Sequence, residues 1–318
     1  MKQKHLKLRE KLKSSKLINF KKKINPVNIL IISIITILIF YLLSSKISFL
    51  NSFQIILKAN PSFILLSLLF LLLTLFFLMI RWLLIIRALH PKAKFKDSLI
   101  SIMCALSLNS VLPSKLGDLF KVYYFKEHGI SQMLGAVFTE RILDIFSLTL
   151  LLLIGSLILN KLTFIYISIA VILMFILSVS FLYILRKKLR KYSLLKNLLY
   201  SINWIIHRPC KGLILFLLSL LVWFCSITQI YLLFLAVSAN VDFLYFSSAI
   251  IIVIFVSLIP ITLAGMGTRE SAIIFLFSSF ASNEILLAAG LLFSFFRYWL
   301  LSILGIPFLY LAIKKKKN

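Results

Sequence analysis

The chain has 318 residues, of which 61% are hydrophobic and 14% charged, with 36 Lys and Arg against 9 Asp and Glu. A soluble domain is about 45–50% apolar and about 25% charged, so this composition excludes a soluble enzyme, a disordered chain and a disulfide scaffold. The apolar runs are continuous rather than short and alternating, which favours helices over a membrane β-barrel. The sequence therefore predicts an all-α polytopic membrane protein.

The chain begins with a basic segment. Ten Lys and Arg and one Glu fall in residues 1–23, so 1–26 is predicted to be a cytoplasmic arm, either an amphipathic helix on the membrane surface or a solvated chain. The apolar run Val27–Ser45 follows. Because this run is long and no small-residue cleavage site comes after it, an uncleaved first span is favoured over a signal peptide.

The rest of the first half contains two complete spans and one incomplete segment. Ser62–Ile86 and Leu134–Leu159 are long enough to cross the bilayer. Between them, Ser98–Leu112 is too short for about 30 Å of hydrocarbon and leads into the Pro- and Gly-containing stretch Asn109–Asp118. Lys residues stand on both sides of this piece. A re-entrant helical hairpin that enters and leaves on the cytoplasmic side therefore fits it better than a complete span.

The second half has a similar series of elements in the opposite orientation. Phe243–Pro260 and Ser271–Phe280 are apolar pieces on either side of the stretch Pro260–Glu270, which predicts a second broken hairpin that enters from the external side. The basic segment Arg186–Lys211 is predicted to be an interfacial cytoplasmic helix. The complete spans of this half are Thr163–Leu185, Gly212–Ala236 and Glu284–Ile313.

The distribution of basic residues predicts the topology. Most Lys and Arg fall in segments assigned to the cytoplasm, whereas the predicted external loops hold only Lys46, Lys58 and Lys161. By the positive-inside rule, both termini are expected on the cytoplasmic side of the inner (cytoplasmic) membrane. Basic residues at the ends of apolar runs also favour anionic lipid over nucleic acid as the partner.

The predicted organisation is a basic arm (1–26), a single membrane domain (27–313) and a basic tail (314–318). The membrane domain holds about six complete spans and two broken hairpins, about eight membrane elements in all. These divide into halves, 27–159 and 163–313, of opposite orientation. Such inverted repeats are typical of secondary transporters, whose broken helices meet at a midplane site. The alternative is a coincidence of span lengths.

The two broken hairpins carry candidate binding residues. Irregular backbone at membrane depth is tolerated only where protein or a watery cavity covers it, and Gly permits tight turns and the close approach of a headgroup. The N-termini of half-helices offer N–H groups that suit phosphate. The alternative is a plain interfacial turn with a snorkelling Lys or Arg. The candidates are Asn109, Pro113, Lys115, Gly117 and Asp118 in the first stretch and Gly265, Gly267, Arg269 and Glu270 in the second.

Further charges fall inside the predicted spans. Glu140 and Asp144 share one helix face, and Arg141 lies three residues before Asp144. Because an unpaired charge in the membrane costs a few kcal/mol, Arg141 is expected to pair with Asp144 or Asp118. The group is either a structural ion pair or an internal polar site for a headgroup or a proton. Arg297 also needs an acidic partner. The candidate partners of Arg297 are Glu270, Glu140 and Asp144.

The sequence contains no motif that indicates an enzyme, a cofactor or a metal site. There is no Walker A motif, no G-x-S-x-G and no zinc signature, and Cys104, Cys210 and Cys225 have no pairing pattern. Gly265-Met-Gly267 lacks the βαβ context of a dinucleotide site. Only Glu140 and Asp144 are even eligible as a catalytic pair, so no enzymatic activity is expected.

The two stretches resemble the flippase-like family, also called the lysylphosphatidylglycerol synthase transmembrane family. The resemblance covers essentially the whole chain after the basic arm, and Thr262 and Leu263 stand where the family often has a second Pro and a Gly. The matching residues are Asn109, Pro113, Gly117 and Asp118, then Gly129 and Ser131, then Glu140, Arg141 and Asp144, and finally Pro260, Gly265, Gly267, Arg269 and Glu270.

The resemblance implies an integral membrane protein of bacteria or archaea. In one branch of the family, such a domain moves aminoacylated phosphatidylglycerol between leaflets and precedes a soluble synthase domain. The present sequence ends directly after its last predicted span, so no synthase activity is expected. Stand-alone relatives are linked to hopanoid traffic or to lipid-linked glycan assembly, so the resemblance leaves the substrate open.

The leading hypothesis is a lipid translocator with a polar cavity between the broken segments. Arg269 and Lys115 would attract an anionic phospholipid or polyprenyl-phosphate headgroup, Glu270, Asp118 and Asp144 would balance charge or carry a proton, and the glycines would shape the turns. An alternative is a non-transporting scaffold that recruits a lipid- or glycan-modifying enzyme through Arg186–Lys211. An intramembrane enzyme is the weakest of the three hypotheses.

Overall fold

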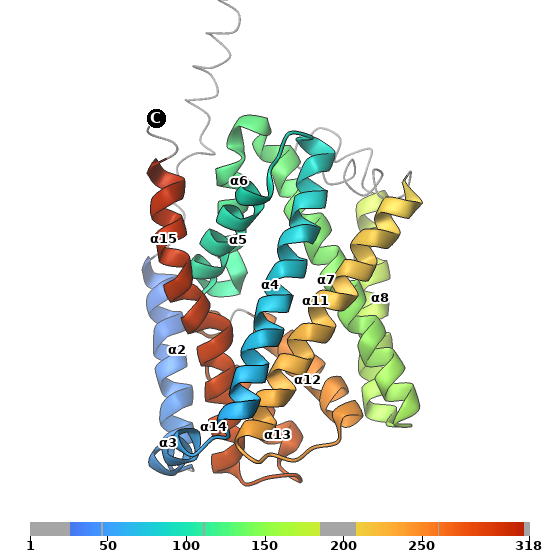
Figure 1. Ribbon diagram of the computed structural model, residues 1–318. Helices are drawn as coiled ribbons and strands as arrows, with labels where there is room; N and C mark the ends of the chain where they lie inside the picture. The colour runs from blue at the N-terminus through green and yellow to red at the C-terminus, as the bar shows by residue number, and fades with distance from the viewer. Residues whose placement is uncertain (1–25, 46, 111, 185–207, 260, 315–318) are drawn as a thin grey trace, which may run out of the picture.

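The computed structural model describes residues 26–45, 47–110, 112–184, 208–259 and 261–314. Within these ranges the protein is an all-helical polytopic membrane protein (Figure 1). The predicted basic arm, most of the predicted interfacial helix and most of the basic tail lie outside the described residues. The α-helices are α2 (Pro26–Ser44), α3 (Phe49–Leu57), α4 (Pro61–Leu89), α5 (Phe95–Asn109), α6 (Leu119–Tyr124), α7 (Ile130–Ile158), α8 (Leu162–Ile184), α11 (Pro209–Ala236), α12 (Phe243–Leu258), α13 (Thr268–Phe277), α14 (Asn283–Ser294) and α15 (Leu301–Lys314). The short 3-10 turns are η2 (Pro113–Asp118), η3 (Lys126–His128) and η4 (Leu263–Gly265), and the π-helical segment η5 (Phe295–Leu300) joins α14 to α15.

Four helical runs are long and apolar enough to cross a membrane: α4, α7, α11 and the continuous run 283–314. A fifth is possible if α2 and α3 count as one span, although they are bent by 85°. The expectation of six complete spans is therefore confirmed only in part. The predicted first span ends at this bend, and α3 was not predicted from the sequence. α12 is a shorter apolar helix, as is the Leu162–Met174 part of α8.

Polar side chains set where several helices begin. Asn60 precedes α4, and its side-chain oxygen accepts a hydrogen bond of 2.9 Å from the Ser62 N–H. Asp242 precedes α12 and accepts bonds of 3.0 Å from the N–H groups of Leu244 and Tyr245. Each oxygen satisfies N–H groups that have no partner inside the helix. These caps end the loops and start the apolar helices at defined residues.

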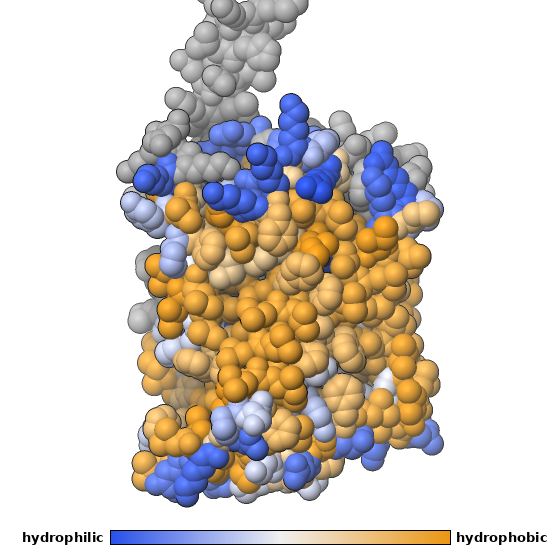
Figure 2. Space-filling view, viewed as in Figure 1, coloured by the Kyte–Doolittle hydropathy of each residue, from blue (hydrophilic) through white to orange (hydrophobic). Residues whose placement is uncertain are grey.

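The outer surface is apolar around the middle of the molecule. Figure 2 shows a broad hydrophobic band with hydrophilic patches at both ends. Large side chains of this surface are strongly exposed, with Leu65 at 67% and Met174 at 71%. A continuous apolar surface of this kind would aggregate in water, whereas in a bilayer it faces lipid. The band is therefore the membrane-facing surface.

Two short helical hairpins enter the bundle from opposite ends (Figure 1). The first hairpin, α5–η2–α6, lies in the upper half of the view, and the second hairpin, α12–η4–α13, lies in the lower half. The turns η2 and η4 contact each other inside the molecule. α6 packs on α5 and α7, and α13 packs correspondingly on α12 and α14.

Glycine makes the turn of the first hairpin possible. A Cβ atom on Gly117 would lie 2.5 Å from the carbonyl oxygen of Ala105 and 2.6 Å from the backbone nitrogen of Asn109. Such distances are shorter than any non-bonded contact allows, so only glycine lets η2 fold this closely onto α5. In the second hairpin, Gly265 and Gly267 have φ angles of 76° and 85°, which side chains disfavour.

The buried apolar side chains form two large clusters. One is centred on α11, α12 and α14, and the other on α4, α5 and the first half of α7. α7 contributes Met133 and Leu143 to the second cluster and Leu148 and Leu152 to the first. The charged residues of α7 lie where the two clusters meet, which places the candidate site at the centre of the bundle.

Candidate functional site

The charged face of α7 meets a buried arginine of α4. Arg81 is 1% exposed, and its two terminal nitrogens lie 3.0 Å from Glu140 Oε1 and 2.7 Å from Asp144 Oδ1. Ser219 of α11 accepts a further hydrogen bond of 2.9 Å from Arg81, and the Trp223 indole N–H donates to Asp144 at 3.1 Å. One guanidinium thus joins two carboxylates that stand one helical turn apart.

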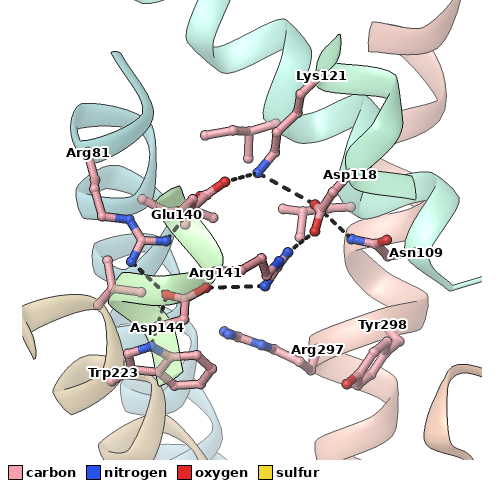
Figure 3. A pocket seen from close by; sticks show the side chains of 14 residues that line it. Arg81, Asn109, Asp118, Lys121, Glu140, Arg141, Asp144, Trp223, Arg297 and Tyr298 are labelled. Atoms are coloured by element: carbon pink, nitrogen blue, oxygen red, sulfur yellow. Dashed lines mark hydrogen bonds and ion pairs between the residues drawn. The ribbon is translucent and has the colours of Figure 1, made fainter. Parts of the chain in front are cut away.

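The first hairpin supplies the remaining charges. Lys121 Nζ lies 2.7 Å from Glu140 Oε2 and 3.5 Å from Asp118 Oδ1. Arg141 bonds Asp118 through one nitrogen and Asp144 through the other, the latter at 3.2 Å. The ion pairs therefore form a closed loop of alternating charge, here called the charge ring (Figure 3). In order around the loop, the charge ring consists of Arg81, Glu140, Lys121, Asp118, Arg141 and Asp144.

Neighbouring side chains hold the charge ring in place. The Asn109 amide donates to Asp118 Oδ1 at 3.3 Å, and Lys121 Nζ lies 4.8 Å from the centre of the Trp82 ring. Asn109 ends α5 and Asp118 ends η2, so the close approach at Gly117 brings the two together. This accounts for the spacing of Asn109, Gly117 and Asp118 in the first stretch.

The charge ring forms the wall of a cavity, here called the first cavity. It encloses about 660 Å³ of space not filled by atoms, including its open side. The Arg141 side chain is 32% exposed, whereas Arg81 and Glu140 are buried. The residues that line the first cavity are Leu78, Arg81, Ile102, Leu106, Asn109, Asp118, Lys121, Glu140, Arg141, Asp144, Val222, Trp223, Arg297 and Tyr298.

Arg297 faces the charge ring from η5. Its guanidinium extends toward Asp144 and Trp223 in Figure 3. Among the described residues it forms no hydrogen bond or ion pair. Of the acidic partners expected for it, Asp144 attracts it electrostatically without forming an ion pair, Glu140 is paired within the ring, and Glu270 lies in a separate cluster.

The charge balance of the first cavity is uneven. The ring has three cationic and three anionic side chains, so it is neutral as a whole. Arg297 adds a fourth cation without a fourth carboxylate. A charge inside a membrane protein is costly unless it is paired or hydrated, and such charges mark ligand sites. The first cavity is therefore chemically suited to a single anionic group.

The second hairpin forms a sealed cluster. Arg269 and Glu270 are 0% exposed, and neither lines the first cavity. Glu270 accepts a hydrogen bond of 2.6 Å from the Gly267 N–H and another from the Ser294 hydroxyl, and Arg269 Nε lies 3.4 Å from Glu270 Oε1. Gly267 thus caps α13 with the help of Glu270, in the manner of a capping box.

The predicted site residues consequently divide into three groups. The structure brings Asn109, Asp118, Glu140, Arg141, Asp144 and Arg297 together around the first cavity, and puts Arg269 and Glu270 outside it. Gly117, Gly265 and Gly267 shape the hairpin turns. Pro113 and Lys115 lie in η2, but their side chains are outside the described part of the structure, as is Pro260.

Four side chains of the candidate site were not predicted from the sequence: Arg81, Lys121, Trp223 and Tyr298. Arg81 could have been recognised from the sequence, because it is a charged residue within an apolar span. The three carboxylates of the first half also need more cationic partners than Arg141 alone. Lys121 was assigned to a cytoplasmic loop and carried no such signal. Within the described ranges no three His, Cys, Asp or Glu side chains come together as metal ligands. Each carboxylate of the charge ring is instead bonded to Arg or Lys.

The family model for the lysylphosphatidylglycerol synthase TM region matches residues 28–305 of the chain. The chain belongs to this family. The matched range of this family includes both hairpins, the charge ring and Arg297, so the site described above lies wholly within the shared part of the chain.

Three archaeal relatives carry the name UPF0104 membrane protein. One from Methanocaldococcus jannaschii is 25% identical over 290 residues, which is 79% of this chain and 85% of the relative. A second from the same organism is 28% identical over 184 residues, or 53% of this chain and 78% of the relative. One from Archaeoglobus fulgidus is 26% identical over 293 residues, or 82% of this chain and 88% of the relative.

Proposed function

We propose that this protein is a translocator that moves a lipid with a phosphate-bearing headgroup between the two leaflets of the membrane. The observation that carries the proposal is the unpaired Arg297 guanidinium, which faces a neutral charge ring inside an apolar bundle. A phosphodiester anion would supply the missing negative charge. Arg141, the most exposed member of the charge ring, is placed to contact the same headgroup.

The proposed route follows from the two hairpins. A headgroup would pass between the turns η2 and η4, which contact each other, while the tails stay in lipid. Helix pairing supports a correspondence between the halves. α4 packs on α11, and the contact of α5 with α15 has a counterpart in that of α12 with α7. We propose that the halves are an inverted repeat of three spans and one re-entrant hairpin each.

The proposed setting is the cytoplasmic membrane, with both termini on the cytoplasmic side. In this orientation the first hairpin opens toward the cytoplasm and the second toward the outside. The substrate is an anionic phospholipid or a polyprenyl-phosphate-linked lipid, and a lipid- or glycan-modifying enzyme is a possible partner. The protein performs no covalent chemistry in this proposal, because the carboxylates of the charge ring serve to position cations.

A leaflet-accessibility assay tests the proposal. The full chain is reconstituted in liposomes with fluorescent phosphatidylglycerol, lysylated phosphatidylglycerol or a polyprenyl-phosphate sugar, and the transfer rate is measured for each lipid. Wild type should move at least one of them, and Arg297→Gln should slow it by about tenfold or more, because a charge-assisted contact is lost. Lys58→Gln, which likewise replaces a cation by Gln but at an exposed residue outside the first cavity, should leave the rate unchanged.

Two results would overturn the proposal. Folded protein that moves none of the three lipids would favour the non-transporting scaffold. Transfer that is equally fast in wild type and Arg297→Gln would exclude the first cavity as the route. In either case the next experiment would be charge reversal in the basic segment that follows α8.

A further inference from the structure

Arg269 has an unusual environment for a buried arginine. It is 0% exposed, and within the described part of the chain its one ion pair is the 3.4 Å contact of Nε with Glu270. The other two guanidinium nitrogens have no hydrogen-bond partner among the described residues. A guanidinium can donate five hydrogen bonds, and leaving donors unused in the interior is costly. These nitrogens therefore lack the partners that the charge ring gives to Arg81.

Two aromatic rings cover this guanidinium. Its central carbon lies 4.4 Å from the ring centre of Tyr298 and 4.9 Å from that of Phe293. Cation–π contacts of this kind stabilise a cation but provide no hydrogen bonds. The two rings therefore stabilise the buried charge of Arg269 and leave its two terminal nitrogens available for hydrogen bonds.

Both covering rings line a second, narrow cavity with about 330 Å³ of space not filled by atoms, including its open side. It adjoins the first cavity, because Trp223, Arg297 and Tyr298 line both. The rings of Tyr298 and Phe293 therefore separate Arg269 from the second cavity, which shares lining residues with the first cavity. The remaining residues of this second cavity are Ser226, Ile230, Ile254, Ser257, Leu258 and Phe293.

Tyr298 stands on the π-helical segment η5, together with Arg297. A π segment carries one extra residue per turn relative to an α-helix, and such segments occur frequently at functional sites. A local change between π and α geometry would turn Tyr298 away from its present position without unfolding the span. Arg297 of the first cavity and Tyr298, whose ring covers Arg269, are thus neighbours on the same π-helical segment.

We infer that Arg269 is a second anion-binding group, closed in this state by Tyr298 and Phe293, and that it receives the phosphate of the headgroup after Arg297. The inference rests on the proposed function for its ligand. The first cavity binds the phosphodiester initially, Tyr298 then moves aside, and the two terminal nitrogens of Arg269 donate a bidentate pair of hydrogen bonds to the anion. Glu270 holds the Nε side of the guanidinium during this transfer.

The first test separates binding from movement. Arg269→Gln should leave equilibrium binding of fluorescent phosphatidylglycerol to detergent-solubilised full chain within about twofold of wild type, because Arg269 is sealed at that stage. The same variant should slow leaflet transfer by about tenfold or more, since the second anion contact is lost. Arg297→Gln should instead weaken binding itself. Equal losses of binding and transfer in Arg269→Gln, or no loss of either, would overturn the inference.

The second test needs no lipid, so it remains decisive if the protein transports nothing. A dicarbonyl reagent that modifies guanidinium groups is applied to purified protein, and adducts are mapped by mass spectrometry. In wild type, Arg297 should react and both Arg269 and Arg81 should not. Tyr298→Ala should make Arg269 reactive by about tenfold or more, whereas Tyr298→Phe, which keeps the ring, should not.

Arg81 serves as the internal control in every variant, because the charge ring occupies its terminal nitrogens. Phe293→Ala removes the other covering ring and serves as an independent variant if Tyr298→Ala fails to fold. An Arg269 that stays unreactive in folded protein after either ring is removed would overturn the inference. Failure of lipid transfer in wild type, with Arg269 exposed by Tyr298→Ala, would overturn the proposed function but leave the closed anion site in place.

Discussion

The two hairpins solve the same problem in different ways. Each brings charged side chains and a glycine turn to the middle of an apolar bundle, and each charge must be balanced there. The first hairpin shares its charges with two long helices, so every member of the charge ring has two partners and the ring borders an open cavity. The second hairpin keeps Arg269 and Glu270 as adjacent residues, sealed behind aromatic rings.

This difference indicates a division of labour. A ring of shared ion pairs is rigid and holds a cavity open, so the first hairpin suits a permanent binding surface. A single ion pair of 3.4 Å with unused donors suits a group that gains a further partner only in another state. Five substitutions test this contrast through protein stability, in order from the largest expected effect to the smallest.

Arg81→Gln should destabilise the protein most. It removes the cation that joins Glu140 to Asp144 and leaves the charge ring with an excess buried negative charge. Breaking a buried pair typically costs about 3–5 kcal/mol. The midpoint of thermal unfolding in detergent should fall strongly, and Lys58→Gln should leave it unchanged. A loss for Arg81→Gln no larger than that of the control would show that the charge ring contributes nothing to stability.

Glu270→Gln should cost about 3 kcal/mol, because Arg269 then stays buried without a carboxylate. Asp118→Asn in the first hairpin should cost less, about 1–2 kcal/mol, since Lys121 and Arg141 each keep another carboxylate. The two variants are compared by thermal unfolding under the same conditions. An equal or larger loss for Asp118→Asn would contradict the contrast between a shared and a sealed cluster.

Gly117→Ala should cost about 1–3 kcal/mol, since its Cβ would overlap the backbone of Ala105 and Asn109 and push η2 away from α5. The same shift should weaken the bond between Asn109 and Asp118. Gly212→Ala in the first turn of α11 is the matched control and should cause no loss, because Ala favours helix. Equal stability of the two variants would mean that the close approach at η2 is not required.

Arg297→Gln should change stability least, by less than about 1 kcal/mol and toward a higher unfolding midpoint, because it removes a charge that has no carboxylate partner. The same variant should slow lipid transfer, as described above. Stability and function therefore move in opposite directions at this residue. A large drop in the unfolding midpoint would show that Arg297 is a structural cation instead.

Much of this site was predictable from local sequence. Pro, Gly and charge inside apolar runs indicated both hairpins, and the i, i+4 spacing of Glu140 and Asp144 indicated a common face. Arg141 was expected to pair with Asp144 or Asp118, and it pairs with both. These inferences succeed because each depends on residues close together in the chain.

The remaining features depend on contacts between distant segments. Arg81 lies 59 residues before Glu140, so hydropathy alone did not indicate which helix α4 would pack against. Arg269 was expected in the cavity because it is charged, but the rings of Phe293 and Tyr298 seal it. The first predicted span also differs from the structure, because the residues at the 85° bend between α2 and α3 include no Pro or Gly that would have indicated it.

Because the ion pairs of the charge ring form a closed loop, one pair can open without leaving any of its side chains unpaired. A linear row of ion pairs has two ends, and opening any pair next to an end leaves a lone charge in the bundle. A loop has no end, so any one of its six contacts can open while every side chain keeps a partner. In the proposed transfer, Arg141 would release one of its two carboxylates, donate hydrogen bonds to the phosphate of the headgroup, and take the carboxylate back afterwards. Each of the six side chains of the charge ring would thus keep an ion-pair partner throughout this exchange.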